Sequence, residues 1–139
     1  MRSGPDPALT DADTEDWTMS TIMLVDDSAT ILLSISNILT KAGYAVEKAG
    51  NAAEGLAKFK GGIKVDLLIT DLNMPGMNGI EFIKEVRGLP NYKFMPILFL
   101  TTESQQARRM EAKAAGASGW LVKPATADEL LNTIKLALR

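Results

Sequence analysis

The sequence predicts an α/β protein in which a five-stranded parallel sheet is covered by five helices on its two faces. Five short apolar runs of strand length alternate with longer stretches whose apolar residues recur at helical spacing. Strands this apolar need cover on both faces, which is typical of doubly wound parallel sheets. With 139 residues, 46% of them hydrophobic, the chain has the size and the core of one compact domain.

The first strand and the first helix are predicted within residues 21–42. The apolar run "TIMLV" at 21–25 ends at two adjacent acidic residues. Apolar side chains then recur at helical spacing, and Gly43 follows as a stop; they are Ile31, Ile35, Ile38 and Ala42.

Four more strands and four more helices follow. The strands are expected at 44–49 ("YAVEKA"), 65–70 ("VDLLIT"), 96–100 ("PILFL") and 119–122 ("GWLV"). An Asn or Thr with Glu three residues later predicts helix starts at 51–54, 78–81 and 126–129. The remaining helix is predicted in "SQQARRMEAKAAG" at 104–116, and the last helix shows one apolar face made by Leu130, Ile134 and Leu138.

Residues 1–20 differ in composition from the rest of the chain. They are rich in Pro, Gly, Ser, Thr and Asp, and show no helical or strand period. They hold five acidic side chains and one arginine, a net charge of −4. We expect a disordered extension, either native or a cloning remnant fused ahead of Met19, followed by one domain at 21–139.

The composition excludes several classes of function. Without cysteine or histidine, the chain has no disulfide, thiolate or imidazole chemistry and lacks the ligands of most zinc sites. A net charge of −2 without a basic stripe argues against nucleic-acid binding. No apolar run reaches the roughly 18 residues of a membrane span, and the acidic N-terminus is unlike a secretory signal. We therefore expect a cytoplasmic monomer that does not insert into membranes.

Side chains capable of chemistry stand at the ends of four predicted strands. They are Asp26, Asp27, Asp71, Thr101 and Lys123. Because the carboxyl ends of parallel strands meet at one edge of the sheet, we expect these groups to converge. Taken singly, each has a simpler interpretation: the paired aspartates as a helix cap, the lysine as a surface residue, and Thr101 with Thr102 as turn residues. The coincidence of all of them favours a site.

The predicted cluster suits phosphoryl transfer. Three carboxylates without nitrogen or sulfur ligands form a hard, all-oxygen site of the kind that Mg²⁺ prefers. Lys123 would add a second positive charge, and Thr101 a hydrogen bond. A phosphoryl group on Asp71 would lie between the metal, the ammonium and the hydroxyl, with the carboxylate as its acceptor.

Residues 21–138 resemble a response-regulator receiver domain, specifically a stand-alone, CheY-like chemotaxis receiver. The resemblance rests on "LVDDSAT", "ITDLNMPGMNG", "FLTTES", "AAGASGWLVKP" and the closing helix. It implies a flavodoxin-like fold with strand order 2-1-3-4-5. It also implies a two-component phosphorylation switch whose only chemistry is its own phosphorylation and dephosphorylation, and which is not an enzyme acting on a separate substrate.

The resemblance implies roles for the acidic residues. Asp71 is the implied phosphoacceptor, taking its phosphoryl group from a phosphohistidine on a histidine kinase. Asp27 is implied to bind Mg²⁺ directly, and Asp26 mostly through water. Asp71 and the backbone carbonyl of Asn73 complete the implied metal ligands.

The other implied roles concern the phosphoryl group. Lys123, Thr101 and the backbone N–H of Thr102 are implied to contact its oxygens, and the Lys123–Pro124 bond is expected to be cis. Asn73 and Glu103 are either plain solvent-exposed residues or, as the resemblance suggests, flank the path of the attacking water. The second interpretation predicts fast autodephosphorylation.

The partner-binding face is expected on the fourth helix, the fifth strand and the last helix. Trp120 is either a core tryptophan or the aromatic residue that turns inward when a receiver is activated, a place usually held by Tyr or Phe. Arg108 and Arg109, with Trp120, are expected to meet an output partner such as a flagellar motor switch protein or the kinase. Ala125 and Thr133 stand where chemotaxis receivers often have Phe and Lys.

Three other functions share features with this sequence. A Mg²⁺-dependent phosphatase with an aspartyl nucleophile would carry an acid two residues after the nucleophile, where this chain has Asn73. A receiver cut from a DNA-binding regulator is not favoured, because the sequence ends directly after the last predicted helix. A phosphate sink, which drains a shared kinase without an output partner, stays open.

Overall fold

The computed structural model describes residues 20–139, and every structural statement below refers to this part of the chain. The extension predicted at 1–20 lies outside it except for Ser20. Five parallel strands form one sheet in the order β2-β1-β3-β4-β5, as predicted. They are β1 (Thr21–Val25), β2 (Ala45–Ala49), β3 (Leu67–Thr70), β4 (Ile97–Thr101) and β5 (Gly119–Val122).

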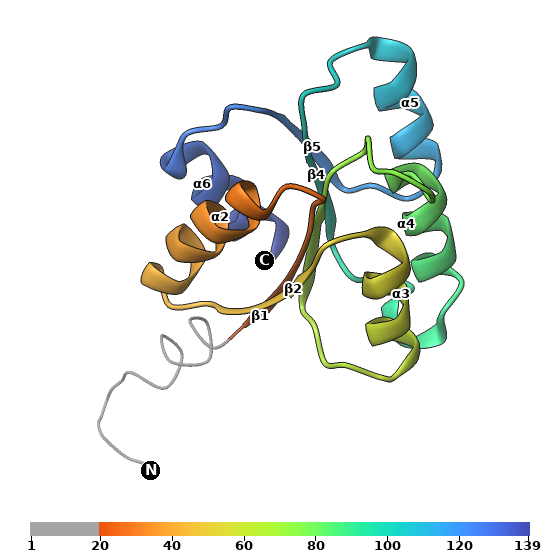
Figure 1. The fold of residues 1–139 in the computed structure, drawn as a ribbon, viewed down its shortest axis with the longest axis horizontal. Helices are drawn as coiled ribbons and strands as arrows, with labels where there is room; N and C mark the ends of the chain where they lie inside the picture. The colour runs from red at the N-terminus through yellow and green to blue at the C-terminus, as the bar shows by residue number, and fades with distance from the viewer. Residues whose placement is uncertain (1–19) are drawn as a thin grey trace.

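Helices lie on both faces of the sheet, which confirms the doubly wound prediction. They are α2 (Ala29–Lys41), α3 (Ala52–Lys60), α4 (Gly79–Arg87), α5 (Gln106–Ala114) and α6 (Ala127–Ala137). Figure 1 shows α2 and α6 on one side of the strands and α3, α4 and α5 on the other. A short 3-10 helix, Pro90–Tyr92, was not predicted, because three residues are too few to show a period.

Side-chain caps begin four of the helices. Asn51 starts α3, and Asn78 and Thr126 form full capping boxes at α4 and α6, as their spacing predicts. The cap of α2 is Ser28, whose Oγ accepts the N–H of Ile31 at 3.3 Å. The two aspartates before Ser28 are therefore not used as the cap, and their carboxylates remain available for another role.

The core divides into two apolar clusters, one on each side of the sheet. One joins β1, β3 and β4 to α3 and α4, and the other joins the same strands to α2 and α6. The central strands β3 and β4 are buried throughout, but β2 and β5 at the edges are only partly covered. The edge strands are less buried than the central ones because each has a strand neighbour on one side only.

The strand register aligns the carboxyl ends of the central strands. Val25 stands opposite Thr70, and Thr70 opposite Phe99. The residues that follow β1 and β3, Asp26 and Asp71, are consequently neighbours at one edge. The backbone N–H of Asp71 donates to the carbonyl of Val25 at 3.0 Å, which fixes this alignment beyond the end of the strands.

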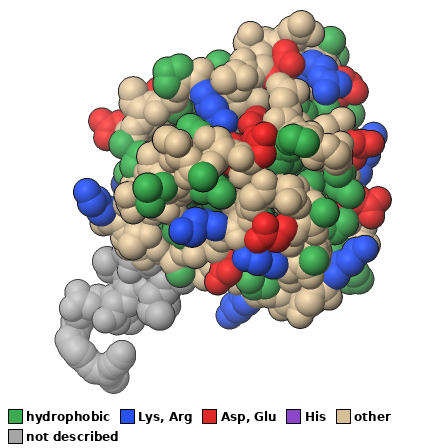
Figure 2. Space-filling model, viewed as in Figure 1, with side chains coloured by type: hydrophobic (Ala, Val, Ile, Leu, Met, Phe, Trp, Pro, Cys, Tyr) green, Lys and Arg blue, Asp and Glu red, His purple; other side chains and the backbone are tan. Residues whose placement is uncertain are grey.

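Two further features of the described residues are the distribution of charge on the surface and the length of the helices. Figure 2 shows basic and acidic side chains interspersed on one face of the molecule, without a continuous stripe of either sign on that face. Among residues 20–139, no helix has the length and apolar character needed to cross a bilayer.

Candidate functional site

The three predicted carboxylates meet at the carboxyl edge of the sheet. Asp26, Asp27 and Asp71 each offer a carboxylate oxygen, and these oxygens lie within 4.8 Å of one another. Asp26 and Asp71 are buried, with 2% and 8% of their surfaces exposed, whereas Asp27 is exposed. Like charges this close repel one another, so the cluster requires compensation by positive charge.

Lys123 supplies that charge from the end of β5. Its ammonium nitrogen lies 2.7 Å from Oδ2 of Asp26 and 3.3 Å from Oδ2 of Asp71. Burial alone would lower the pKa of Lys123, but the hydrogen bond to Asp26 and the charges of both carboxylates outweigh burial and raise the pKa. The lysine therefore stays protonated at neutral pH. The Lys123–Pro124 peptide bond is cis, as expected from the sequence.

Asp26 is held at both oxygens. Its Oδ1 accepts the backbone N–H of Ser28 at 2.9 Å, and its Oδ2 accepts the ammonium of Lys123. Burial nevertheless raises the pKa of Asp26 above its usual value, because desolvation exceeds the opposing effects of these two hydrogen bonds. The ionised carboxylate is thus kept in place at an energetic cost, which is typical of functional groups.

The two oxygens of Asp71 have different surroundings. Oδ1 accepts the backbone N–H of Leu72 at 2.7 Å and that of Asn73 at 3.4 Å. Oδ2 faces the ammonium of Lys123. The loop after β3 therefore fixes the orientation of the carboxylate through Oδ1 and turns Oδ2 toward the positive charge.

Gly79, the first residue of α4, packs directly against the loop that carries Asp71. The sequence analysis did not assign this role. Its N–H donates to the carbonyl of Leu72 at 2.8 Å. A Cβ atom at this position would overlap the carbonyl oxygen of Asp71 and would lie 2.6 Å from the ring of Phe99. Only glycine lets the first turn of α4 approach the acceptor loop this closely. In the sequence, the only sign of this role was the second glycine of "NMPGMNG", which is Gly79.

The hydroxyl of Thr101 belongs to the loop that follows β4. Thr101 is fully buried, and its Oγ1 accepts the N–H of Glu103 at 3.3 Å. Thr102 is exposed, and the carboxylate of Glu103 accepts the N–H of Gln105 at 3.2 Å. Thr101 is thus at the predicted sheet edge, and its backbone carbonyl accepts the N–H of Lys123 at 2.8 Å. Its hydroxyl, however, bonds to this loop and not to the carboxylate cluster.

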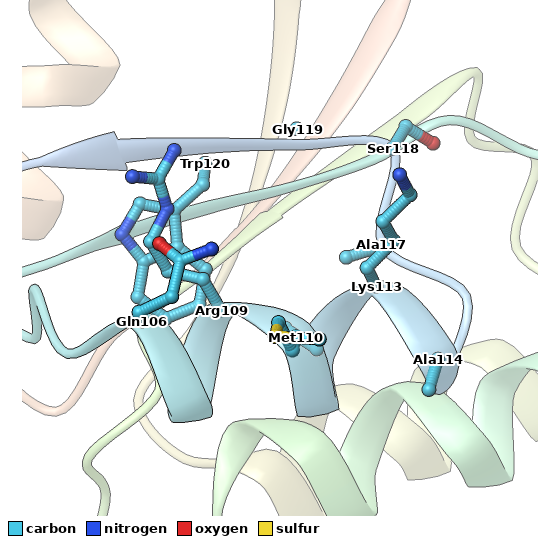
Figure 3. A pocket seen from close by; sticks show the side chains of 10 residues that line it. Gln106, Arg109, Met110, Lys113, Ala114, Ala117, Ser118, Gly119 and Trp120 are labelled. Carbon is cyan, nitrogen blue, oxygen red and sulfur yellow. The ribbon is translucent and has the colours of Figure 1, made fainter.

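Trp120 connects this loop to β5. Its indole N–H donates to the carbonyl of Glu103 at 3.1 Å, and its ring lies 5.4 Å from that of Phe99. The guanidinium of Arg109 stands over the indole, 6.0 Å from the ring centroid. Figure 3 shows Trp120 and Arg109 at one end of a groove between α5 and β5. Trp120 is only partly buried, so it is a boundary residue and not a core residue.

The two expected partner-binding arginines differ in their surroundings. Arg108 pairs with Glu111 on the same helix at 2.9 Å, so its charge is partly neutralised. Arg109 is exposed and lines the groove. Asn73 is also exposed and Glu103 half-buried, so both lie within reach of water.

The donor atoms fit a hard divalent cation. The cluster presents three carboxylates, of which one is exposed and leaves room for water ligands. Mg²⁺ is typically held by one or two carboxylates and keeps several waters. Asn73 follows Asp71 by two residues, and its N–H already lies over the Asp71 carboxylate, so its backbone belongs to the rim of the same site.

Comparisons with known proteins agree with this geometry. Residues 22–135 match the family model of the response regulator receiver domain. The chain is 36% identical to the chemotaxis protein CheY1 of Helicobacter pylori over 118 residues, which cover 84% of this chain and 95% of that protein. It is 40% identical to the chemotaxis protein CheY homolog of Campylobacter jejuni over 115 residues, covering 82% and 88%.

A solved structure shows the same likeness in three dimensions. The chemotaxis response regulator CheY4 of Vibrio cholerae superimposes with a TM-score of 0.83 at 47% identity. The match covers 86% of this chain and 99% of that structure. The similarity therefore extends over nearly all of the described fold.

Proposed function

This chain belongs to the response regulator receiver family, and on that premise we propose that it is a phosphorylation switch in which Asp71 accepts a phosphoryl group from a histidine kinase. One observation carries the proposal: Lys123 lies within hydrogen-bond distance of both Asp26 and Asp71 in the three-carboxylate cluster. Receivers of this family are signalling switches, so the output is a change in binding and not turnover of a substrate.

The proposed transfer is an in-line displacement. The oxygen of Asp71 that faces Lys123 forms a bond to phosphorus while the bond between phosphorus and the donor imidazole nitrogen breaks, and the imidazole leaves with that electron pair. Lys123 stabilises the negative charge of the phosphoryl oxygens. Mg²⁺, when held by Asp26, Asp27, Asp71 and the Asn73 carbonyl, would supply further positive charge at those oxygens. The N–H groups of the acceptor loop orient the carboxylate.

The proposed switch runs through the loop after β4. In the ground state Thr101 bonds to the N–H of Glu103, and Trp120 bonds to the carbonyl of the same residue. A phosphoryl group would compete for the Thr101 hydroxyl and for the ammonium of Lys123. Movement of Thr101 would shift Glu103 and loosen Trp120 from its carbonyl, which changes the face made by α5, β5 and α6. This is a two-state element biased by a charge.

The proposed output partner binds this face, within the cytoplasm. Besides Arg109 and Trp120, the face carries exposed apolar side chains that the sequence analysis missed: Met110 at 63% exposure, Val122 at 43% and Leu136 at 64%. A partner with apolar residues next to acidic ones fits this mixture. Because the compared relatives are chemotaxis proteins, we propose a flagellar motor switch protein or the kinase as the partner.

The proposal is tested by release of inorganic phosphate from phosphoramidate, with and without Mg²⁺. We expect Mg²⁺-dependent release from the parent protein and none from Asp71→Asn. Asp128→Asn, an exposed carboxylate on α6, is the control for the loss of one charge and should keep the parental rate. Equal release from the parent and Asp71→Asn would contradict the assignment of the acceptor.

A phosphate sink is the second candidate, favoured by the exposure of Asn73 and the partial exposure of Glu103, which leave the site open to water. A sink would be phosphorylated in the same way but would bind no output partner. Pulldown with the candidate partners, in the presence and absence of beryllofluoride, separates the two functions. Binding that increases with beryllofluoride supports a signalling role, and binding to the kinase alone, unchanged by beryllofluoride, supports a sink.

A further inference from the structure

Basic side chains gather at the edge of the sheet opposite the functional site. Every described α-helix follows a strand and returns antiparallel to it, so all helix C-termini lie at the amino edge of the sheet (Figure 1). Each of these helices has a basic residue in its last turn; they are Lys41, Lys58, Lys60, Lys84, Arg87, Lys113 and Lys135. Such charges complement the helix dipoles. Lys58 is paired with Glu47 at 3.8 Å and Arg87 donates to the carbonyls of Gly116 and Tyr92, so the other lysines are the ones considered for binding an anion.

One part of this end combines cations with an exposed aromatic ring. We define the basal patch as Lys60, Lys64, Lys93 and Phe94. The three lysines are exposed, and Phe94 is 90% exposed, the highest value among the large hydrophobic residues of the described chain. A phenylalanine ring this exposed, next to a lysine in the sequence, is an unusual feature for a surface without a partner.

The two loops of the basal patch are held together. The Tyr92 hydroxyl donates to the carbonyl of Ile63, which ties the segment before Phe94 to the segment before β3. Leu68 stands opposite Ile97 in the sheet, so the loops that lead into β3 and β4 run side by side. The backbone segments that carry Lys64, Lys93 and Phe94 are therefore held next to each other.

The described chain begins next to this patch. The N–H of Thr21 donates to Oδ2 of Asp66 at 2.8 Å, and the N–H of Asp66 donates to the carbonyl of Thr21 at 2.8 Å. Asp66 is two residues from Lys64. Ser20 itself meets the start of β2, because its carbonyl accepts the N–H of Ala45 at 3.0 Å. The residues before Ser20 are thus joined to the domain at the amino edge of the sheet, the edge that also carries the basal patch.

Those preceding residues have the complementary composition. Four acidic side chains and a tryptophan occur within seven positions: Asp11, Asp13, Glu15, Asp16 and Trp17. They stand three to nine residues before Ser20, a reach of up to about 10–30 Å at the 3.3–3.6 Å per residue of extended chain. Because the segment is tethered, its effective concentration at the patch is on the order of millimolar, so weak contacts suffice.

We propose that residues 11–17 bind the basal patch of the same molecule, with carboxylates against the lysines and Trp17 against Phe94. Several weak ion pairs at an exposed surface attract the segment over a Debye length of about 8–10 Å at moderate salt, and the two aromatic rings add an apolar contact. The contact lies at the end of the domain away from Asp71 and does not depend on the phosphorylation proposal.

The test uses the full chain, whose lack of cysteine makes a nitroxide label at Thr14→Cys unique. Amide signals of residues 60–64 and 93–95 should be broadened at low salt. In about 0.5 M NaCl, where charges are strongly screened, the broadening should fall to the level caused by tethering alone. The control for tethering alone is a labelled chain in which the four acidic residues are neutralised by Asp11→Asn, Asp13→Asn, Glu15→Gln and Asp16→Asn. The broadening in the labelled parent should be at least twice the broadening in this control.

Two matched variants assign the effect to the patch. Lys64→Gln with Lys93→Gln should reduce the broadening to the tethering level, whereas Lys48→Gln with Lys84→Gln, which removes the same charge from exposed positions outside the patch, should reduce it clearly less. Phe94→Ser should reduce it in part. Equal loss in both double variants, broadening at the α5–β5 groove instead, or no excess over tethering would overturn the proposal. Broadening of unlabelled copies mixed with labelled ones would also overturn it, in favour of contact between two molecules.

Discussion

Asp26 is buried and Lys123 partly buried, and in this pair burial and pairing act in opposite directions. Burial disfavours both charges, and the 2.7 Å contact favours both. At Lys123 the effect of the contact exceeds that of burial, so the pKa is raised and the charged form is favoured. At Asp26 the effect of burial exceeds that of the contact, so the pKa is also raised, which favours the neutral form. The folded structure therefore disfavours the ionised form of Asp26, and ionisation of Asp26 at neutral pH reduces the stability of the fold.

This imbalance predicts a pH-dependent effect of Asp26→Asn. A folded-state pKa above the unfolded value of 3.8 means that the folded state binds more protons just above that pH, so stability falls as pH rises through this window. The variant lacks this titration. In urea unfolding without Mg²⁺, the free energy of unfolding of the variant minus that of the parent should therefore increase as pH rises from about 4 toward 7. A difference that stays constant with pH would contradict this account.

The exposed residues Asn73 and Glu103 lead to a prediction about lifetime. Replacing them by Asn73→Met and Glu103→Leu puts apolar bulk where water reaches the site. We expect the phosphoryl lifetime to lengthen by about tenfold, which equals about 1.4 kcal/mol in the barrier. The measurement is the decay of acid-stable labelled protein after donor removal. Glu111→Leu on the exposed surface of α5 is the control, and an unchanged lifetime in the double variant would show that water does not pass these residues.

At the scale of elements, the first turn of α4 and the acceptor loop depend on each other. Gly79→Ala would force a Cβ into the carbonyl oxygen of Asp71 and the ring of Phe99, so the loop or the helix must shift. We expect a loss of about 1–3 kcal/mol of stability, typical of overpacking, together with slower phosphate release. Calorimetry and the phosphoramidate assay measure the two effects.

Gly61→Ala is the matched control for this substitution. Gly61 also flanks a helix, has an ordinary φ of −74°, and would place its Cβ 3.4 Å from the nearest atom. Its stability should change by less than about 1 kcal/mol. If both variants lost the same stability, the close approach at Gly79 would not be the cause.

Local patterns predicted the elements well where the determining contacts are local. Helix starts at Asn51, Asn78 and Thr126 follow from hydrogen bonds within three residues. Strand starts were less accurate: the second, third and fourth predicted strands begin one or two residues too early. An apolar residue that packs beneath a sheet without pairing in it looks the same in the sequence as the first residue of a strand.

At the scale of the whole molecule, the sequence predicted which residues meet but not how they bond. Convergence of Asp26, Asp71 and Lys123 follows from parallel topology alone. The ion pairs of Lys123 join residues 97 and 52 positions apart, and no local pattern contains such a contact. The same is true of Trp120, whose hydrogen bond to Glu103 depends on the pairing of β4 with β5.

The charge arrangement of the whole domain leads to a last prediction, about Mg²⁺ and stability. Three carboxylates share one edge with a single ammonium, so the folded state concentrates negative charge that the unfolded chain disperses. A cation that binds only the folded cluster stabilises it by about 2.7 kcal/mol at a hundredfold excess over Kd. For a domain of this size that raises Tm by roughly 10 °C.

The control for this effect is NaCl at equal ionic strength, which screens the cluster without binding in it. Thermal unfolding with Mg²⁺ should exceed the NaCl control in the parent protein, and the excess should shrink in Asp27→Asn, which loses an exposed ligand but leaves the Lys123 pairs intact. Asp128→Asn should keep the full excess. Equal stabilisation by Mg²⁺ and NaCl would mean that the carboxylates hold no specific cation, and Lys123 would then be their main compensation.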